Sequence, residues 1–418
     1  MISFIKRLGE KIKALTWHDK SDLYAKRFWI LFLLVLAVIA FIRPAERSIT
    51  HNYSRAAYAW FNEEPLYSGS GNGFLYFPQS IFLYTPFLWQ PFPEDFEDFG
   101  EKPFKETLQT HFKLRSAEAF YRIISVGFFA FGIWSLCGAL TKPGEDSPFF
   151  AVSLMAFPAS ITAASNGQFN VLLAATILLS SAAIIRNRWW WATLWLVLGL
   201  VAKPHGIIPI LLFGVLMPQL WWRLPVGLVV FSLFGFAHWN QAYVIEQWKG
   251  AIHQIQTATR PDVEAYDDIA AMFRKFGIDL SDNVWFVIRA AFSLVTLWMA
   301  WIYRKHFNTR VAIVLIGAAA TAYMMIFNPR TETNSFLILS PFIGSLAAFM
   351  FRDGRESALS WILVFICIGL GSDNYLYDLT RIWWKPFISC IFFGLLLYWA
   401  IKKKVVNSDF IIFQRTAG

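Results

Sequence analysis

The stretch "AFPASITAASNGQFNVLLAATILLSSAAII", residues 156–185, carries the pattern that decides the fold. Two apolar runs, 149–165 and 169–185, are separated by the polar break "SNGQFN" at 165–170. Each run approaches the roughly 20 residues with which a helix crosses a membrane. Glycine and amide side chains are typical of turns. The stretch therefore predicts two membrane-spanning helices joined by a short polar turn.

The composition of the whole chain supports this interpretation. Of the 418 residues, 56 % are hydrophobic and only 16 % are charged, whereas a soluble chain carries about 25 % charged residues. The net charge of +9 does not indicate nucleic-acid binding, because the basic residues cluster beside apolar runs, as in the loops that orient membrane proteins. The three cysteines have no CxxC or metal-binding spacing. We therefore expect a multi-spanning membrane protein.

We predict an all-α fold with about twelve transmembrane helices. Lys and Arg concentrate in the cytoplasmic loops of membrane proteins, and the uncleaved, amphipathic N-terminal segment 1–27 is rich in them. With that segment in the cytoplasm, the even-numbered loops and the tail 402–418 are also basic. Both termini are therefore expected in the cytoplasm, with the multi-pass domain 28–401 in the cytoplasmic (inner) membrane. The approximate cores of the spans are 28–43, 117–139, 149–165, 169–185, 190–202, 206–221, 224–240, 284–303, 311–327, 336–351, 358–371 and 383–400.

The two longest predicted loops, 44–116 and 241–283, then lie outside. Within the first, segment 74–92 is apolar, but prolines interrupt it, and the following segment 93–106 has six acids against two lysines. Such an acidic segment is a poor cytoplasmic loop. We expect 74–92 to form a helix that lies on, or dips into, the external face, so that the first external loop is long and partly helical.

Polar breaks in this topology fall on the external side. The breaks are "NGQFN" at 166–170, "AKPHG" at 202–206, "FNPRTETN" at 327–334 and "GSDNYLYD" at 371–378. Ordinary turn chemistry is one explanation of the first break. The cytoplasmic turns, in contrast, are short, basic and flanked by tryptophan. The pattern therefore indicates that polar chemistry is concentrated on one face of a helical bundle.

The charged residues in these breaks have both a structural and a functional interpretation. In the structural interpretation, Lys203 is a lysine that extends to the interface, and Glu332 is the partner of Arg330 or Lys203 in an ion pair. Ionisable residues near membrane depth, however, often mark functional sites. Lys203 and His205, on either side of Pro204, form a cationic corner suited to an anion such as phosphate.

Several stretches resemble glycosyltransferase family 87, whose members are similar to polyprenol-phosphate-mannose-dependent mannosyltransferases of the C-type membrane fold. The resemblance rests on "NGQFNVLLAATILLSSAA" at 166–183 and "LVLGLVAKPHGIIPILLFGVL" at 196–216. The first loop, with "NYSRAAYAWFNEEPLY" at 52–67 and "FLYFPQSIFLYTPF" at 74–87, and "LRSAEAFYRIISV" at 114–126 agree with it. The similarity covers roughly residues 28–350.

This resemblance implies an enzyme that transfers a sugar, mannose by preference, from a polyprenyl-phosphate donor to a glycan or glycolipid acceptor on the external face. The family has an aspartate soon after span one as the presumed base, but this sequence has no Asp between Arg43 and Pro93. The candidates for the base are therefore His51, Glu46 and Glu332. The candidates for substrate binding are Asn52, Arg55, Asn166, Gln168, Asn170, Lys203, His205 and Arg330.

Two other functions stay open at this stage. A transporter or flippase of a lipid-linked sugar would need polar residues at mid-membrane in broken helices. A catalytically degenerate family member would lack the base. The sequence has no Walker-type loop, Rossmann fingerprint or zinc spacing, which disfavours a nucleotide-sugar donor on the cytoplasmic side. We expect no metal and no cofactor. The expected partners are membrane lipids, and no nucleic acid is expected.

Overall fold

The computed structural model describes residues 20–42, 48–67, 74–89, 104–142, 144–258, 266–353, 357–372 and 380–404. Within these ranges the regular elements are helices and none is a strand, which confirms the all-α prediction. The α-helices are α2 Ser21–Ile42, α3 Thr50–Phe61, α4 Phe104–Leu140, α5 Phe149–Asn166, α6 Phe169–Ile185, α7 Trp189–Ala202, α8 Ile207–Leu216, α9 Arg223–Gly235, α10 Gln241–Ala258, α11 Ile269–Lys275, α12 Asp282–His306, α13 Thr309–Phe327, α14 Ser340–Asp353, α15 Ser357–Leu370 and α17 Trp384–Lys402. The 3₁₀ helices are η2 Pro78–Leu83, η3 Thr85–Phe87, η4 Pro204–Gly206, η5 Pro218–Leu220 and η6 Ser335–Ile338.

At least one described helix lies over each of the twelve predicted span ranges. Fewer than twelve of these helices are long and apolar enough to cross a membrane. Six are long and apolar enough to cross a membrane: α2, Arg115–Leu140 within α4, α5, α12, α13 and α17. The α8–α9 pair is bent by 116° at a short break and adds a seventh candidate if it is one broken span. Helices α6, α7 and Ala358–Leu370 are apolar but shorter. The count of twelve therefore stays a prediction.

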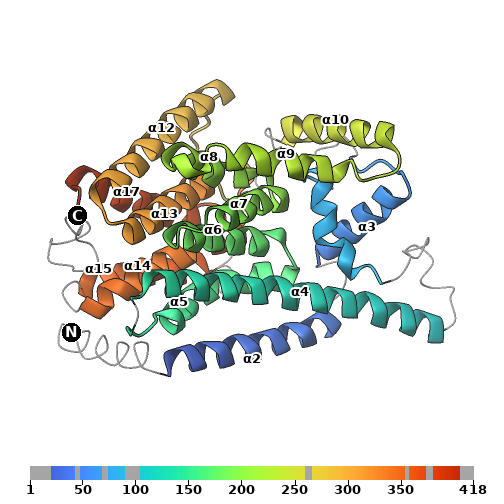
Figure 1. Cartoon of the computed structure of the whole chain (residues 1–418), viewed down its shortest axis with the longest axis horizontal. Helices are drawn as coiled ribbons and strands as arrows, with labels where there is room; N and C mark the ends of the chain where they lie inside the picture. The colour runs from blue at the N-terminus through green and yellow to red at the C-terminus, as the bar shows by residue number, and fades with distance from the viewer. Residues whose placement is uncertain are drawn as a thin grey trace.

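Helices α6 and α13 form the centre of the bundle. Every residue from Val311 to Ala322 of α13 is buried, and α6 is buried along nearly its whole length. Helices α2, α4 and α5 lie on one side of this pair, and α8, α9 and α12 lie on the other (Figure 1). The ends of α6 and α13 therefore meet inside the protein, and polar residues at those ends are held by deeply buried helices.

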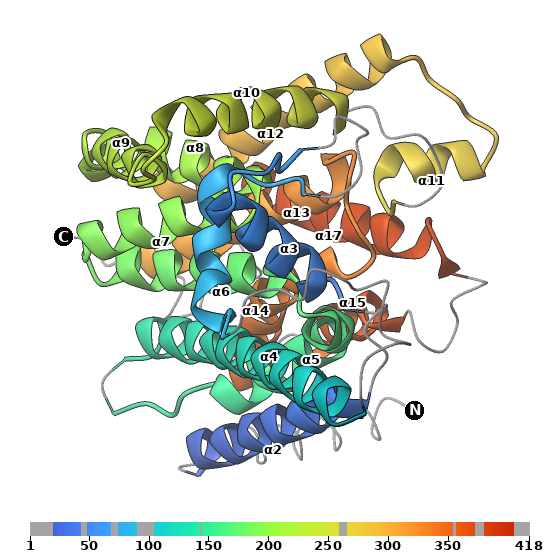
Figure 2. The same cartoon turned by 90° about the vertical axis from the view of Figure 1, so that its right-hand side faces the viewer.

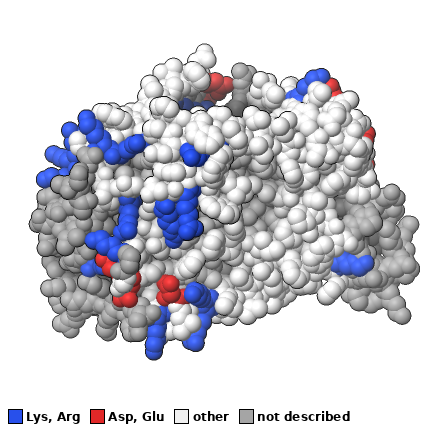
Figure 3. Space-filling view, viewed as in Figure 1, with Lys and Arg blue, Asp and Glu red and all other residues white. Residues whose placement is uncertain are grey.

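The two ends of the bundle differ in their charge. On the face seen in Figure 3, Lys and Arg side chains gather at the left-hand end, where α15 and the end of α17 lie, and few charges interrupt the middle. At the opposite end α3 lies across the helix ends, with α10 beside it (Figure 2). One end is thus basic, and the other is covered by the segments between the helices of the bundle.

The two long predicted loops contain helices. In the first, α3 is followed by η2 and η3, each with a proline in its first turn. The described part of the segment predicted as one helix, 74–89, therefore contains two short 3₁₀ helices instead. The second contains the amphipathic helix α10 and the short helix α11. Much of segment 1–27, Glu46, most of "GSDNYLYD" and nearly all of the tail 402–418 lie outside the described residues.

Candidate functional site

The break "SNGQFN" is a tight turn between α5 and α6. Gly167 has a φ of +67° in the left-handed region, which glycine adopts without strain. A Cβ atom there would lie 2.6 Å from Cγ2 of Thr50, so α3 packs directly against the turn. Gln168 then returns to an extended conformation and precedes the first residue of α6. The turn directs Gln168 and Asn170 into the protein, where both are buried.

The break "AKPHG" ends α7 at Lys203. Lys203 is extended, with φ −152° and ψ 140°, as expected because the residue before a proline avoids the helical region. Gly206 allows the chain to approach α7 closely, since a Cβ atom there would lie 2.6 Å from the carbonyl carbon of Gly199. The turn holds Lys203 with only 5 % of its surface exposed.

The break "FNPRTETN" follows the buried helix α13. Thr331 donates its backbone N–H to the carbonyl of Asn328 at 3.2 Å, which forms a turn and turns Glu332 back toward α6. A second segment runs beside it: the backbone N–H of Asp267 donates to the Thr331 carbonyl at 2.7 Å. The Thr333 hydroxyl donates to Oδ2 of Asp267 at 2.5 Å. Residues far apart in the sequence therefore fix the backbone on both sides of Glu332.

The Glu332 side chain contacts one residue from each of the breaks "SNGQFN" and "AKPHG". Its Oε2 lies 3.4 Å from Nζ of Lys203 and 3.4 Å from Nδ2 of Asn170. The side chain of Lys203 is 6 % exposed, whereas that of Glu332 is 32 % exposed. Asn170 also lies within hydrogen-bond distance of Asn334 Oδ1 at 2.9 Å and Gln168 Oε1 at 2.7 Å. The amides thus orient the carboxylate, and Lys203 balances its charge.

A cavity of about 170 Å³ opens at this ion pair. One water molecule needs about 10–15 Å³ in the same measure, so the cavity has room for a group of the size of a phosphate or a sugar ring. Its lining combines charged groups with apolar and aromatic ones: Leu75, Tyr76, Lys203, Pro204, His205, Ile255, Tyr266, Asn328, Pro329, Arg330 and Glu332. Four predicted site residues, from two separate breaks, therefore share one cavity.

Aromatic side chains lie beside the charged groups of this cavity. The Arg330 guanidinium lies 5.5 Å from the centre of the Tyr266 ring, in the range of a cation–π contact. Burial, reinforced by the Glu332 carboxylate, raises the pKa of Tyr76, so its hydroxyl stays protonated. The cavity thus contains two cationic side chains and one carboxylate, and its net charge favours an anion.

The other predicted residues that the structure describes do not line this cavity. The ring of His51, in the first turn of α3, hydrogen-bonds through Nδ1 to the Ser48 carbonyl. Asn52 is half-buried and Arg55 is exposed on the same helix. The backbone carbonyl of Asn166 accepts from Ile49 at 3.1 Å. These contacts attach α3 to the turn between α5 and α6. The roles predicted for His51, Asn52, Arg55 and Asn166 stay predictions, as does that of Glu46.

A second buried polar cluster holds α3 in position. Arg122 of α4 lies 3.5 Å from the Glu118 carboxylate and donates to the Ser48 hydroxyl at 2.8 Å. Thr50 donates to Oε1 of Glu118 at 2.7 Å. Tyr53 stacks on Phe169, with the ring centres 3.9 Å apart. The start of α3 is thereby fixed to both α4 and α6.

Sequence reasoning missed the segment Tyr266–Asp268 and Lys385. Lys385 is buried and donates to the Thr333 carbonyl at 2.6 Å. Burial raises the pKa of Asp267, against the opposing effects of the Thr333 hydroxyl and Lys385. Burial also raises the pKa of Asp268 to about 6. The adjacent acids at 267–268 were the available signal, but a sequence does not reveal that they pack beside 331–333.

Among the described residues, no group of three or more His, Cys, Asp and Glu side chains is arranged to hold a metal ion. No protein-family model and no curated protein sequence matches this chain. The similarity to glycosyltransferase family 87 therefore rests on the motifs quoted above.

Proposed function

We propose that this protein is an integral-membrane glycosyltransferase. It transfers a sugar, with mannose favoured by the family resemblance, from a polyprenyl-phosphate donor to an acceptor on the external face. The observation that carries the proposal is the cavity at Lys203, Arg330 and Glu332, which combines cations, a carboxylate and aromatic walls at one end of an apolar helical protein.

The cations suit the leaving group of this reaction. A polyprenyl-phosphate sugar leaves as an anionic phosphate monoester, which preorganised cations stabilise. Charge-assisted N–H···O bonds are about 2.7–2.9 Å long, whereas Lys203 and Glu332 lie 3.4 Å apart. This long contact leaves Lys203 available to a phosphate oxygen, and Arg330 lines the same cavity.

Glu332 is the base best supported by its surroundings, since it lines the cavity and is partly exposed. When a phosphate oxygen engages Lys203, the Glu332 carboxylate is released from its ion pair and can accept a hydrogen bond from the acceptor hydroxyl. The acceptor oxygen attacks the anomeric carbon while its proton passes to the Glu332 carboxylate. The bond from that carbon to the phosphate oxygen breaks, and its electron pair leaves on the polyprenyl phosphate.

The orientation is part of the proposal. The Lys203 cavity lies at the end of the helical bundle opposite the basic end. This arrangement agrees with a basic end in the cytoplasm and a site on the external side. Single-cysteine labelling in intact cells, in a variant without Cys137, Cys367 and Cys390, tests it. A membrane-impermeant reagent should label Arg330→Cys but not Lys305→Cys, and the reverse result would refute the orientation.

The function is tested with purified protein in sealed lipid vesicles and a polyprenyl-phosphate-mannose donor. The transferase releases free polyprenyl phosphate as sugar is transferred. A transporter or flippase moves the intact donor across a sealed vesicle without releasing polyprenyl phosphate. Transport without cleavage, or a donor that stays intact with a panel of acceptors, would refute the proposed enzyme.

A further inference from the structure

A second hollow lies at the basic end of the protein. It has a volume of about 590 Å³ and lies beside the ends of α4 and α6 and the start of α13. We call it the basic basin. It is lined by Gly138, Ala139, Thr141, Lys142, Glu145, Ser147, Ile185, Arg186, Arg188 and Arg310. None of these residues lines the Lys203 cavity, so the basin is a separate feature and does not depend on the proposed enzyme activity.

The charges of the basin are unbalanced. Four of the lining side chains are cationic, and Glu145 is the one carboxylate among them. Glu145 is itself engaged, because its Oε2 lies 2.8 Å from the guanidinium of Arg352. Within the described part of the chain, Arg188 and Arg310 make no ion pair. The basin therefore has an excess of positive charge that no described side chain neutralises.

Arg186 is held at the edge of the basin by Ser135. Arg186 donates to the hydroxyl and the carbonyl of Ser135, at 2.9 and 3.0 Å. Partial burial and the neighbouring charge of Arg188 lower the pKa of Arg186, and an anion between the two would relieve that repulsion. Ser135 thereby anchors one guanidinium, while Arg188 stays exposed.

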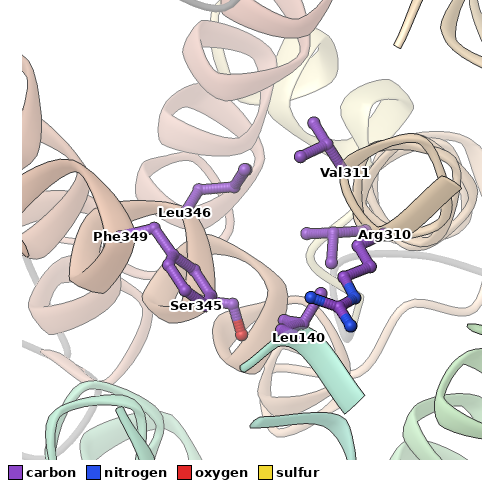
Figure 4. Close-up of a pocket in the computed structure, with 7 residues that line it drawn as sticks. Leu140, Arg310, Val311, Ser345, Leu346 and Phe349 are labelled. Atoms are coloured by element: carbon purple, nitrogen blue, oxygen red, sulfur yellow. The ribbon is translucent and has the colours of Figure 1, made fainter. Parts of the chain in front are cut away.

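Arg310 lies between the basic basin and the apolar interior of the protein. Its guanidinium lies beside Leu140, at the edge of a small cavity that it shares with Ser345, Leu346 and Phe349 (Figure 4). That cavity measures about 20 Å³, room for one water molecule. Arg310 therefore separates an apolar interior from the open basin and presents its charge between the ends of packed helices.

We propose that the basic basin binds a phosphate group, and that its natural source is the headgroup of an anionic phospholipid. Arginine binds phosphate oxygens through paired N–H donors and is weakly hydrated. Basic pockets between membrane helices on the cytoplasmic side suit anionic headgroups. The positive charge of the basin suits the phosphate itself, whether it belongs to a lipid or to a soluble ion.

The test uses the full chain in nanodiscs and two double variants of equal charge. Arg188→Gln with Arg310→Gln removes two cations from the basin. Arg304→Gln with Lys305→Gln removes two cations only a few residues from Arg310, outside the basin lining. Retention of phosphatidylglycerol against phosphatidylcholine is measured by native mass spectrometry, and competition by inorganic phosphate is measured separately. The single variant Arg188→Gln, at an exposed position, replaces the first pair if that pair fails to fold.

The basin variant should lose phosphatidylglycerol affinity by at least about tenfold, while the Arg304/Lys305 control stays within about twofold of the parent. Inorganic phosphate that binds with the same variant dependence, without retained lipid, would support the site and identify a soluble source. Equal losses in both variants, or no loss in the basin variant, would overturn the proposal.

Discussion

Two buried ion pairs at the same end of the protein differ in their access to solvent. Arg122 and Glu118 are each 1 % exposed, and hydroxyl groups of the α3 segment surround them. In the pair of Lys203 and Glu332, the lysine is 6 % exposed but the carboxylate is 32 % exposed and lines a cavity. The first pair is enclosed by protein, and the second faces space that a ligand can occupy.

Because of this difference in exposure, we expect a structural role for the enclosed pair and a chemical role for the accessible pair. A buried pair that loses one partner leaves an uncompensated charge, so the enclosed pair is needed for stability. An accessible pair can exchange one partner for a ligand of the same charge. Arg122 and Glu118 therefore hold α3 on the bundle, whereas Lys203 and Glu332 line a cavity that a ligand can enter. The predictions below test this division, beginning with the largest expected effect.

The largest effect is expected on turnover. Glu332→Gln keeps the size of the side chain but removes the base, so transfer should fall by about 10²–10⁴ while donor binding survives. Glu246→Gln is the control, because Glu246 is in an exposed pair with Lys249 and should change the rate less than twofold. Initial rates and donor affinity are measured together. If Glu332→Gln retains a tenth of the parental rate, another group is the base, and His51→Ala and Glu46→Gln become the variants to measure.

The next effect is on stability. Arg122→Met removes one of the two cations at the Glu118 carboxylate, since Arg115 stays 3.0 Å from its Oε2, and should cost about 1.5–3 kcal/mol, the range of a hydrogen bond to a charged group. The double variant Arg122→Met with Glu118→Met should recover part of this loss, because the enclosed pair is then absent and Arg115 is partly exposed. Denaturation midpoints of the nanodisc-purified variants provide the measurement. A stable Arg122→Met protein, with an unstable Lys203→Met protein, would reverse the roles assigned to the two pairs.

The smallest effect concerns Asp268, which lies 3.7 Å from Arg289 and caps α11 through the Ala271 N–H. Its pKa of about 6 in the folded protein is above the unfolded value near 3.9. Between these values the folded state holds more protons than the unfolded state, so stability falls as pH rises from about 4 to 6.

The Asp268→Asn variant should lack this pH dependence, which amounts to at most about 3 kcal/mol for the parent, while asparagine still caps the helix. The measurement is the denaturation midpoint of both proteins at pH 4, 5, 6 and 7. Parallel curves for the two proteins would show that Asp268 does not titrate in this range.

The sequence was sufficient for the helices and for the polar turns. Apolar runs and basic flanks located a helix near every predicted span, because hydrophobicity and turn residues are local signals. The same signals identified Lys203, His205, Arg330 and Glu332, which meet in one cavity. They did not fix the number of spans, since several of the helices are short and one pair is bent.

Long-range contacts were beyond sequence reasoning. Asp267 and Lys385 support Glu332 from segments 65 and 53 residues away in the sequence (332 − 267 and 385 − 332). Asn170 was expected to contact substrate, and its amide instead lies against Glu332 and Asn334 in the structure. A buried amide and an accessible one look alike in a single sequence. Only the packing of α6 against the segment after α13 distinguishes them.

The central claim is that the Lys203 cavity holds the phosphate of the sugar donor. Lys203→Ala and Lys113→Ala each remove one lysine, but Lys113 does not line the cavity. Consumption of polyprenyl-phosphate-mannose by both variants and the parent, at equal protein and lipid concentration, is the direct measurement. We predict a loss of about 10²–10³ for Lys203→Ala and a change of less than twofold for Lys113→Ala. A Lys203→Ala protein that consumes the donor at the parental rate would contradict the account.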